Sequence, residues 1–107
     1  MAVRLRVEFL VPLKYPDGID IEPERLFEVR EEVVKRFGAI TIHPLSTEGV
    51  WISPKTNKRC YDVCKRFEVS IDKNEENEKS LIEFKEILKI MFKQEEIYML
   101  YTEVVQV

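Results

Sequence analysis

The chain opens with apolar and polar residues in strict alternation. Every second residue from 3 to 11 is apolar, namely Val3, Leu5, Val7, Phe9 and Val11. Successive side chains of a strand point to opposite faces of its sheet, so this pattern predicts a strand over residues 3–11 with one buried face. The run Pro16-Asp17-Gly18 then marks a turn.

Two later segments place apolar residues three or four positions apart, which is the spacing of a helix. Pro23 suits the first position of the first helix, and Gly38 suits the left-handed residue that closes it. The second helix begins after Asp72 or Asn74, either of which could cap it. Its apolar stripe consists of Leu81, Phe84, Leu88 and Met91.

Four further segments have strand patterns, at residues 39–43, 49–53, 60–72 and 95–107. Residues 44–48 are either a short loop between two strands or a large bulge within one strand. The resulting order is strand, helix, long hairpin, helix, strand, in a single domain over residues 1–107. This order resembles the α+β ferredoxin-like βαββαβ fold, in which two helices cover one face of an antiparallel sheet. The resemblance indicates no function, because many unrelated activities share this fold.

The central hairpin contains the only tryptophan, Trp51. If its arms are residues 39–53 and 59–72, the turn falls at residues 54–57 and places Trp51 opposite Tyr61. Such a cross-strand aromatic pair stabilises a hairpin, which gives Trp51 a structural role. In the alternative interpretation the two rings form the wall of a ligand pocket, with Lys58 and Arg59 at its lip.

Charge is unevenly distributed along a chain whose net charge is −3. Residues 55–66 contain five basic residues and one acid, whereas residues 72–86 contain six acids and three lysines. The net charge excludes a general basic field for nucleic acid. The basic hairpin tip is either a solvated turn or a site for phosphate or a nucleic-acid backbone. RNA binding on the open sheet face is disfavoured, because charged residues stand where stacking aromatics are needed.

His43 is the only histidine and therefore the only candidate for a histidine general acid or base. Its alternative role is structural, at the end of a strand. Cys60 and Cys64 are four residues apart, about 13 Å along a strand, which is too far for a disulfide or one metal ion. We expect free thiols. No glycine-rich phosphate motif or EF-hand pattern is present, so we expect neither a metal nor a cofactor.

The open face of the sheet combines charges of both signs. If the first strand neighbours the strand at 60–72, Glu8 can pair with Arg66, and Arg4 or Arg6 can pair with Glu68. Such pairs usually stabilise a sheet weakly. A cleft lined in this way could also hold a small anionic ligand, and Glu8 and Arg66 are the candidate ligand-binding residues.

The last strand is apolar on both faces, with Met99, Tyr101 and Val105 on one and Tyr98, Leu100 and Val104 on the other. This predicts burial on both sides, with a second copy of the chain covering one of them. We therefore expect a homodimer joined through the open face or the edge near this strand. No apolar run approaches the ~20 residues of a membrane span, and the N-terminus does not resemble a signal peptide, so we expect a cytoplasmic protein.

These observations favour a small homo-oligomeric binding or regulatory module whose ligand the sequence does not identify. The alternative is a small cofactor-independent enzyme of the dimeric α+β type, which uses His43 in an aromatic-lined pocket. A third hypothesis is weak binding of nucleic acid or phosphate through the hairpin tip at residues 55–66.

Overall fold

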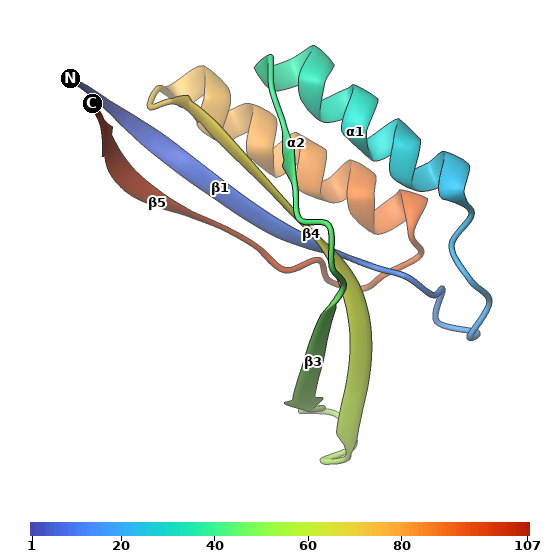
Figure 1. The fold of residues 1–107 in the computed structure, drawn as a ribbon. Coiled ribbons are helices and arrows are strands. Elements are labelled where there is room, and N and C mark those ends of the chain that lie inside the picture. The colour runs from blue at the N-terminus through green and yellow to red at the C-terminus, as the bar shows by residue number, and fades with distance from the viewer.

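The structure, a computed structural model, describes residues 1–107 and confirms the ferredoxin-like order of elements. The elements are β1 (Ala2–Pro12), α1 (Pro23–Phe37), β2 (Thr41–Ile42), β3 (Thr47–Ile52), β4 (Arg59–Asp72), α2 (Glu75–Met91) and β5 (Met99–Gln106). The strands form one antiparallel sheet in the order β2-β4-β1-β5, and β3 also pairs with β4. Both helices cover the same face of this sheet (Figure 1).

The core lies between the sheet and the two helices. Four of the five alternating apolar residues of β1, namely Leu5, Val7, Phe9 and Val11, face the helices and are fully buried, as the alternation predicts, whereas Val3 is exposed. The ring of Phe9 stacks on Phe67 of β4 with 5.2 Å between ring centroids, and it meets the edge of Phe84 of α2 at 5.5 Å. Three aromatic rings from two strands and a helix therefore join the layers at the centre of the core.

Both ends of α1 and the start of α2 agree with the residues predicted to bound them. Pro23 is the first residue of α1, and Gly38 follows it with φ 87°, a left-handed conformation that glycine adopts without strain. Of the two candidate caps of α2, the structure selects Asn74, whose side chain accepts a hydrogen bond from the backbone N–H of Asn77 at 2.7 Å. Acidic side chains in the first turn of α2 also stabilise the helix, because they lie at the positive end of its dipole.

Replacing Asn74 by alanine is expected to lower the free energy of unfolding by about 1 kcal/mol, because a backbone donor at the start of α2 loses its partner. Urea denaturation monitored by circular dichroism measures this change. Asn74→Ser is the matched control, since serine also caps helices, and it should remain close to the unsubstituted chain. Equal losses for alanine and serine would show that the cap contributes little.

Residues 43–46 form a bulge between β2 and β3. Thr41 pairs with Glu68 and Thr47 pairs with Cys64, so the side of β2 and β3 carries two residues more than the β4 segment it faces. The amine of Lys65, which interrupts the apolar face of β4, donates to the carbonyl of Pro44 at 3.0 Å. The bulge thus provides a hydrogen-bond partner for this charged residue.

The predicted pairing of Trp51 with Tyr61 is wrong by one residue. Trp51 lies opposite Cys60, and Tyr61 lies opposite Val50. The hairpin closes where the N–H of Ser53 donates to the carbonyl of Lys58, which shifts the pairing. Because a one-residue slip moves a side chain to the other face, the two rings lie on opposite faces and do not form a pair.

β3 and residues 59–63 of β4 form an arm that projects beyond the helix-covered part of the sheet (Figure 1). Residues directly opposite each other share a face, so Val50 and Tyr61 lie on the same side of the arm. The four apolar residues of this side are Val50, Ile52, Tyr61 and Val63, and each is more than half exposed. The arm therefore carries an apolar face that nothing in the chain covers.

β5 is an edge strand and is largely exposed in the single chain, so the prediction that one of its faces is buried within the chain is wrong, and cover of the other face by a second copy stays a prediction. It pairs only with β1, and its side chains lie beyond the part of the sheet that encloses the core. Met99 packs against the core, but Tyr101 is 48% and Val105 61% exposed. The apolar character of β5 is consequently a surface property of the single chain.

Candidate functional site

The open face of the sheet, away from the helices, carries a group of polar side chains on neighbouring strands. Glu8 of β1 lies directly opposite Glu68 of β4, and Glu68 also faces Thr41 of β2. One row further along, Arg66 is opposite Leu10. Register thus brings side chains from three strands together at the centre of the open face.

Two carboxylates facing each other across a strand pair repel and destabilise the sheet. Here each is balanced by an arginine on a diagonal: Arg66 forms an ion pair with Glu8, and Nε of Arg6 lies 3.5 Å from Oε1 of Glu68. The Glu8 side chain is only 16% exposed and that of Glu68 31%. The centre of the face is therefore an alternating, electrically balanced group of two acids and two guanidinium ions.

A third arginine at the end of the same face is fully engaged. Arg4 donates to Asp72 at 2.6 Å, to the hydroxyl of Ser70 at 2.8 Å and to the Ser70 carbonyl at 2.9 Å. These contacts fasten β1 to the last residues of β4. Arg4 therefore has a structural role, and its contact with Asp72 can serve as a control for the charged residues around Glu8.

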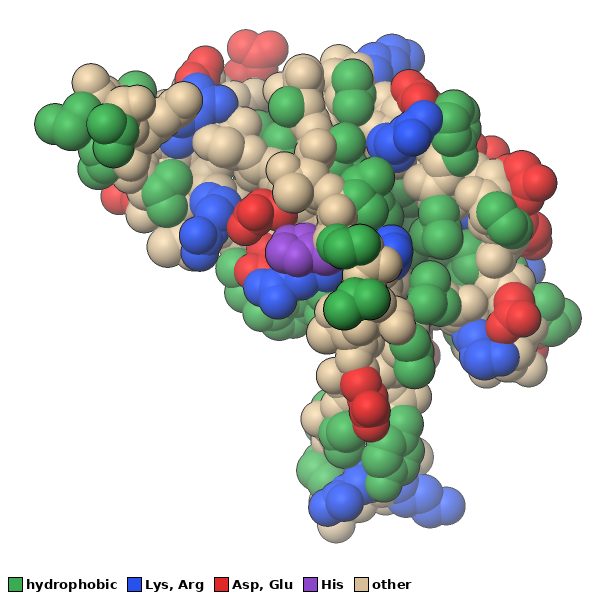
Figure 2. All heavy atoms as spheres, in the orientation of Figure 1, with side chains coloured by type: hydrophobic (Ala, Val, Ile, Leu, Met, Phe, Trp, Pro, Cys, Tyr) green, Lys and Arg blue, Asp and Glu red, His purple; other side chains and the backbone are tan.

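His43 lies beside this group. Its backbone N–H donates to the backbone carbonyl of Arg66 at 3.1 Å, which continues the pairing of β2 with β4. Its Nε2 atom is enclosed and has no hydrogen-bond partner. An enclosed polar atom without a partner is costly, and its presence needs an explanation. Figure 2 shows the histidine, in purple, with acidic and basic side chains around it. We name His43, Arg66, Glu8, Glu68 and Arg6 the His43 cluster.

Three of the residues selected from the sequence, His43, Glu8 and Arg66, come together in this cluster. Both sets of expected ion pairs form, but the sequence analysis did not select Glu68 or Arg6 as ligand-binding residues. The signal that could have identified Glu68 is its pairing with Glu8. That pairing depends on the register of β1 with β4, which alternation alone does not determine.

The other selected residues lie on the arm. Arg66 and Cys60, the partner of Trp51, are six residues apart in β4, which corresponds to roughly 20 Å. The Trp51 indole N–H donates to Asp62 at 2.7 Å, and neither Lys58 nor Arg59 forms an ion pair. Trp51, Tyr61, Lys58 and Arg59 therefore do not join the His43 cluster.

The turn between β3 and β4, at the end of the arm, contacts the loop after α2. The amine of Lys55 donates to Oε2 of Glu95 at 2.8 Å. This hydrogen bond raises the pKa of Lys55 and lowers the pKa of Glu95, so both remain charged over a wide pH range. Lys58 and Arg59 are thus left as the unpaired charges of the tip.

The two cysteines are free and differ in their surroundings. Cys60 is half-buried, whereas Cys64 is buried against Pro12 and Thr47, its neighbours across the two strand pairs. Burial raises the pKa of the Cys64 thiol to about 11, and the Asp62 carboxylate adds to the shift. Cys64 is therefore protonated and inert at neutral pH.

We expect a thiol reagent at neutral pH to label Cys60 and to leave Cys64 unmodified in the folded protein. The native chain holds the Cys64 proton more tightly than the unfolded chain does. Its contribution to stability is therefore fully present below the unfolded pKa and is lost as pH rises through about 11. Mass spectrometry of labelled Cys60→Ser and Cys64→Ser variants measures each site, and rapid labelling of Cys64 at neutral pH would contradict this account.

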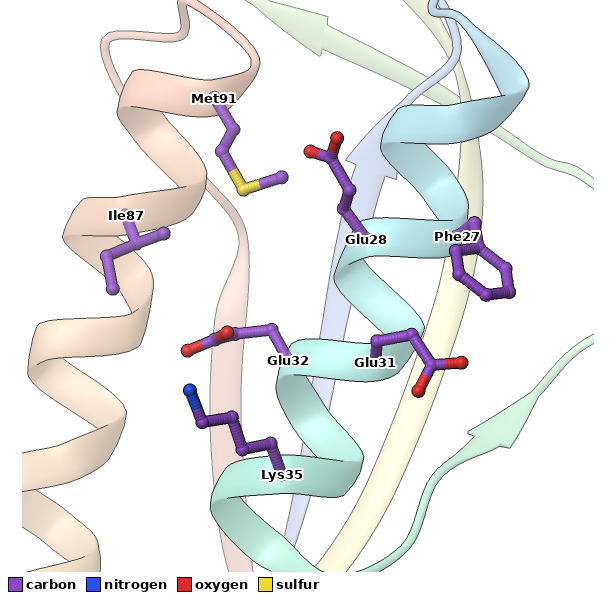
Figure 3. Close-up of a pocket in the computed structure, with 7 residues that line it drawn as sticks. All are labelled: Phe27, Glu28, Glu31, Glu32, Lys35, Ile87 and Met91. Carbon is purple, nitrogen blue, oxygen red and sulfur yellow. The ribbon is translucent and has the colours of Figure 1, made fainter.

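Two hollows of the surface lie away from the His43 cluster. One of about 390 Å³ separates α1 from α2, and there Glu28, Glu32 and Lys35 extend toward Ile87 and Met91 (Figure 3). A second, of about 250 Å³, lies between α1 and the sheet near Ile42 and Lys65. Neither includes a member of the His43 cluster. That cluster lies on an open sheet surface, where a ligand would have to be covered from outside.

The arrangement of acidic, histidine and cysteine side chains also bears on metal binding. Nowhere do three or more of them gather in a geometry that could hold a metal ion. Neither helix has both the length and the apolar character that crossing a bilayer requires.

Comparison with known proteins gives a similarity in structure but none in sequence. No family model matches the chain, and no curated protein matches it in sequence. Among solved structures, it is similar to a phage SAM lyase in complex with S-methyl-5'-thioadenosine. The TM-score is 0.69 with 12% sequence identity, and the match covers 99% of this chain and 92% of that chain. At this identity the similarity establishes the fold alone.

Proposed function

We propose that the protein is a small-ligand-binding module whose site is the His43 cluster. The observation that supports this most strongly is the carboxylate pair of Glu8 and Glu68 on the two central strands. Facing acids do not by themselves stabilise a sheet, and their position beside two arginines on an open face favours a binding role. The enclosed, unpartnered Nε2 of His43 adds a polar atom that a ligand could satisfy.

The charges of the cluster favour a ligand that itself carries both signs. Glu8 and Glu68 can accept from an ammonium group or from hydroxyl groups, and Arg6 and Arg66 can bind a carboxylate. S-adenosylmethionine (SAM) combines an ammonium, a carboxylate, a sulfonium and a ribose diol. The likeness to a SAM lyase that holds S-methyl-5'-thioadenosine supports the same chemical class here. We propose an adenosyl sulfur compound as the ligand.

Isothermal titration calorimetry with SAM and with S-methyl-5'-thioadenosine tests this proposal. We expect SAM to bind and S-methyl-5'-thioadenosine to bind more weakly, because it lacks the amino acid group that Arg6 and Arg66 can hold. Methionine and adenosine, titrated separately, show which half of the ligand the protein recognises. Absence of binding by all four compounds would remove the adenosyl class.

A second candidate function is an enzyme that acts on such a ligand, with His43 as acid or base. It is favoured by the free Nε2 atom at the edge of the cluster and by the lyase activity in the name of the similar structure. In such a reaction His43 would take a proton from the side-chain carbon next to the carbon that carries the sulfonium. The C–H electron pair would form a C=C bond, the C–S bond would break with its electrons going to sulfur, and S-methyl-5'-thioadenosine and 2-aminobut-3-enoate would be released.

His43→Gln is expected to abolish any such product formation while SAM still binds, because glutamine can donate and accept hydrogen bonds but cannot take up a proton at neutral pH. Chromatography of SAM incubated with each variant measures S-methyl-5'-thioadenosine directly. If the unsubstituted chain forms product and His43→Gln forms it equally fast, His43 is not the acid or base.

We further propose that the module works as a homo-oligomer. This proposal is supported by the apolar side chains of both β5 and the arm, which are exposed in the single chain. A second copy would shield these surfaces from water.

A further inference from the structure

Two exposed apolar areas lie at opposite ends of the sheet. Basic residues border one of them, and acidic residues border the other. The first is the apolar face of the arm, which ends in the unpaired Lys58 and Arg59. In Figure 2 the lower part of the arm combines apolar side chains with basic ones at the tip. An exposed apolar face with a charged rim is typical of a contact surface.

The second area is formed where α2 passes beside β5. The Tyr101 hydroxyl donates to Oε1 of Glu78 at 3.2 Å and ties the strand to the first turns of the helix. Ile82 lies one turn beyond Glu78 on the same side of α2. Val3 and Val105 lie directly opposite each other on the same face of the sheet as the core, and both are more than half exposed. We name Val3, Ile82, Tyr101 and Val105 the α2–β5 flank.

The charges beside the flank are complementary to those of the arm. Glu75 and Glu76, in the first turn of α2, form no ion pair within the chain. The acidic segment 72–86 and the basic segment 55–66 do not contact each other through any ion pair of the chain. Other charges of both segments are paired elsewhere in the chain, which leaves Lys58 and Arg59 on the arm and Glu75 and Glu76 on α2 without an ion pair within one copy.

A chain cannot bring its own arm onto its own flank. Val3 and Pro12 stand at the two ends of β1, nine residues or roughly 30 Å apart, and Pro12 is the residue beside the base of the arm. The arm also points away from the end of the sheet where both termini lie (Figure 1). Only another molecule can supply the contact.

We propose that the arm of one copy binds the α2–β5 flank of a second copy. The apolar face of the arm covers the apolar flank, and Lys58 and Arg59 approach Glu75 and Glu76. Each contact joins the arm of one copy to the flank of another, and it either closes as a two-fold pair that exchanges arms or repeats from copy to copy into a ring or a chain. This inference rests on the homo-oligomeric part of the proposed function and is independent of the ligand.

The test uses one variant of each surface, measured by light scattering after size exclusion and by native mass spectrometry. Ile52→Asp disables the arm and Ile82→Lys disables the flank, and both side chains are exposed, so neither change should unfold the core. Matched controls make the same changes at exposed positions outside both surfaces, namely Leu45→Asp and Ile90→Lys.

We expect the unsubstituted chain and both controls to form oligomers, and Ile52→Asp and Ile82→Lys each to be monomers of 12.8 kDa. An equimolar mixture of the two monomers should form a one-to-one complex, because one retains its flank and the other its arm. A monomeric unsubstituted chain, oligomers of both surface variants, or a mixture that stays monomeric would overturn the proposal. SAM titration of the monomeric variants tests the ligand proposal separately.

Charge reversal tests the electrostatic part of the contact. Lys58→Glu with Arg59→Glu should weaken the oligomer, as should Glu75→Lys with Glu76→Lys, whereas a chain carrying all four changes should assemble again. Assembly of the unsubstituted chain should also weaken as salt is raised, because salt screens exposed charges. Loss of assembly in the fourfold variant would contradict this pairing of the two surfaces.

Discussion

Phe9→Ala is expected to lower the free energy of unfolding by about 3–5 kcal/mol, the largest effect of any single change considered for this chain. The ring of Phe9 is buried and contacts Phe67 of β4 and Phe84 of α2. Alanine would leave a cavity at the point where both strands meet a helix. Because small domains are stable by only about 5–15 kcal/mol, much of the variant could be unfolded at physiological temperature.

The matched control is Phe27→Ala on the outer side of α1. Phe27 is 53% exposed, and its main polar contact is the Arg30 guanidinium, 4.6 Å from the ring centroid. We expect a cost of about 0.5–1 kcal/mol from that contact. Urea denaturation of both variants gives the comparison, and a similar cost at the two positions would contradict the description of the core.

Glu68→Gln is expected to weaken ligand binding about 10- to 100-fold, because a hydrogen bond to a charged group contributes roughly 1.5–3 kcal/mol. The same change should alter stability little. It removes an exposed ion pair with Arg6, and it also removes the repulsion between Glu68 and Glu8. Calorimetry with SAM and urea denaturation of the same sample measure both effects.

Asp72→Asn is the matched control for Glu68→Gln. Asp72 is on the same strand and the same face, but its partner is Arg4 at the end of the sheet. We expect unchanged affinity for the ligand and a small loss of stability from the weakened Arg4 contact. Equal losses of affinity for both variants would indicate a general electrostatic effect in place of a site at the His43 cluster.

Local signals predicted most of the fold. The alternation of β1 and the proline and glycine that bound α1 depend only on neighbouring residues, and the structure agrees with them. The hairpin register depends on a single turn, closed by the Ser53 and Lys58 hydrogen bond, and sequence spacing placed it one residue away. The exposure of β5 depends on its place at the sheet edge, which its own residues do not reveal.

The candidate site was predictable to the extent that alternation assigns faces. It placed Glu8 and Arg66 on the open face and anticipated their ion pair. The position of His43 beside Arg66 requires the bulge at residues 43–46, which no local pattern specified. The separation of Trp51 and Tyr61 followed from the register, and this removed the aromatic-lined pocket that the sequence suggested.

The central claim is that the His43 cluster on the open face holds the ligand, and an amide NMR titration with SAM tests it most directly. The account predicts that chemical shifts change with SAM at His43, Arg66, Glu68 and Glu8, while the residues between α1 and α2 near Met91 stay unchanged. Shift changes confined to the hollow between the helices, or no changes at any concentration of SAM, would contradict it.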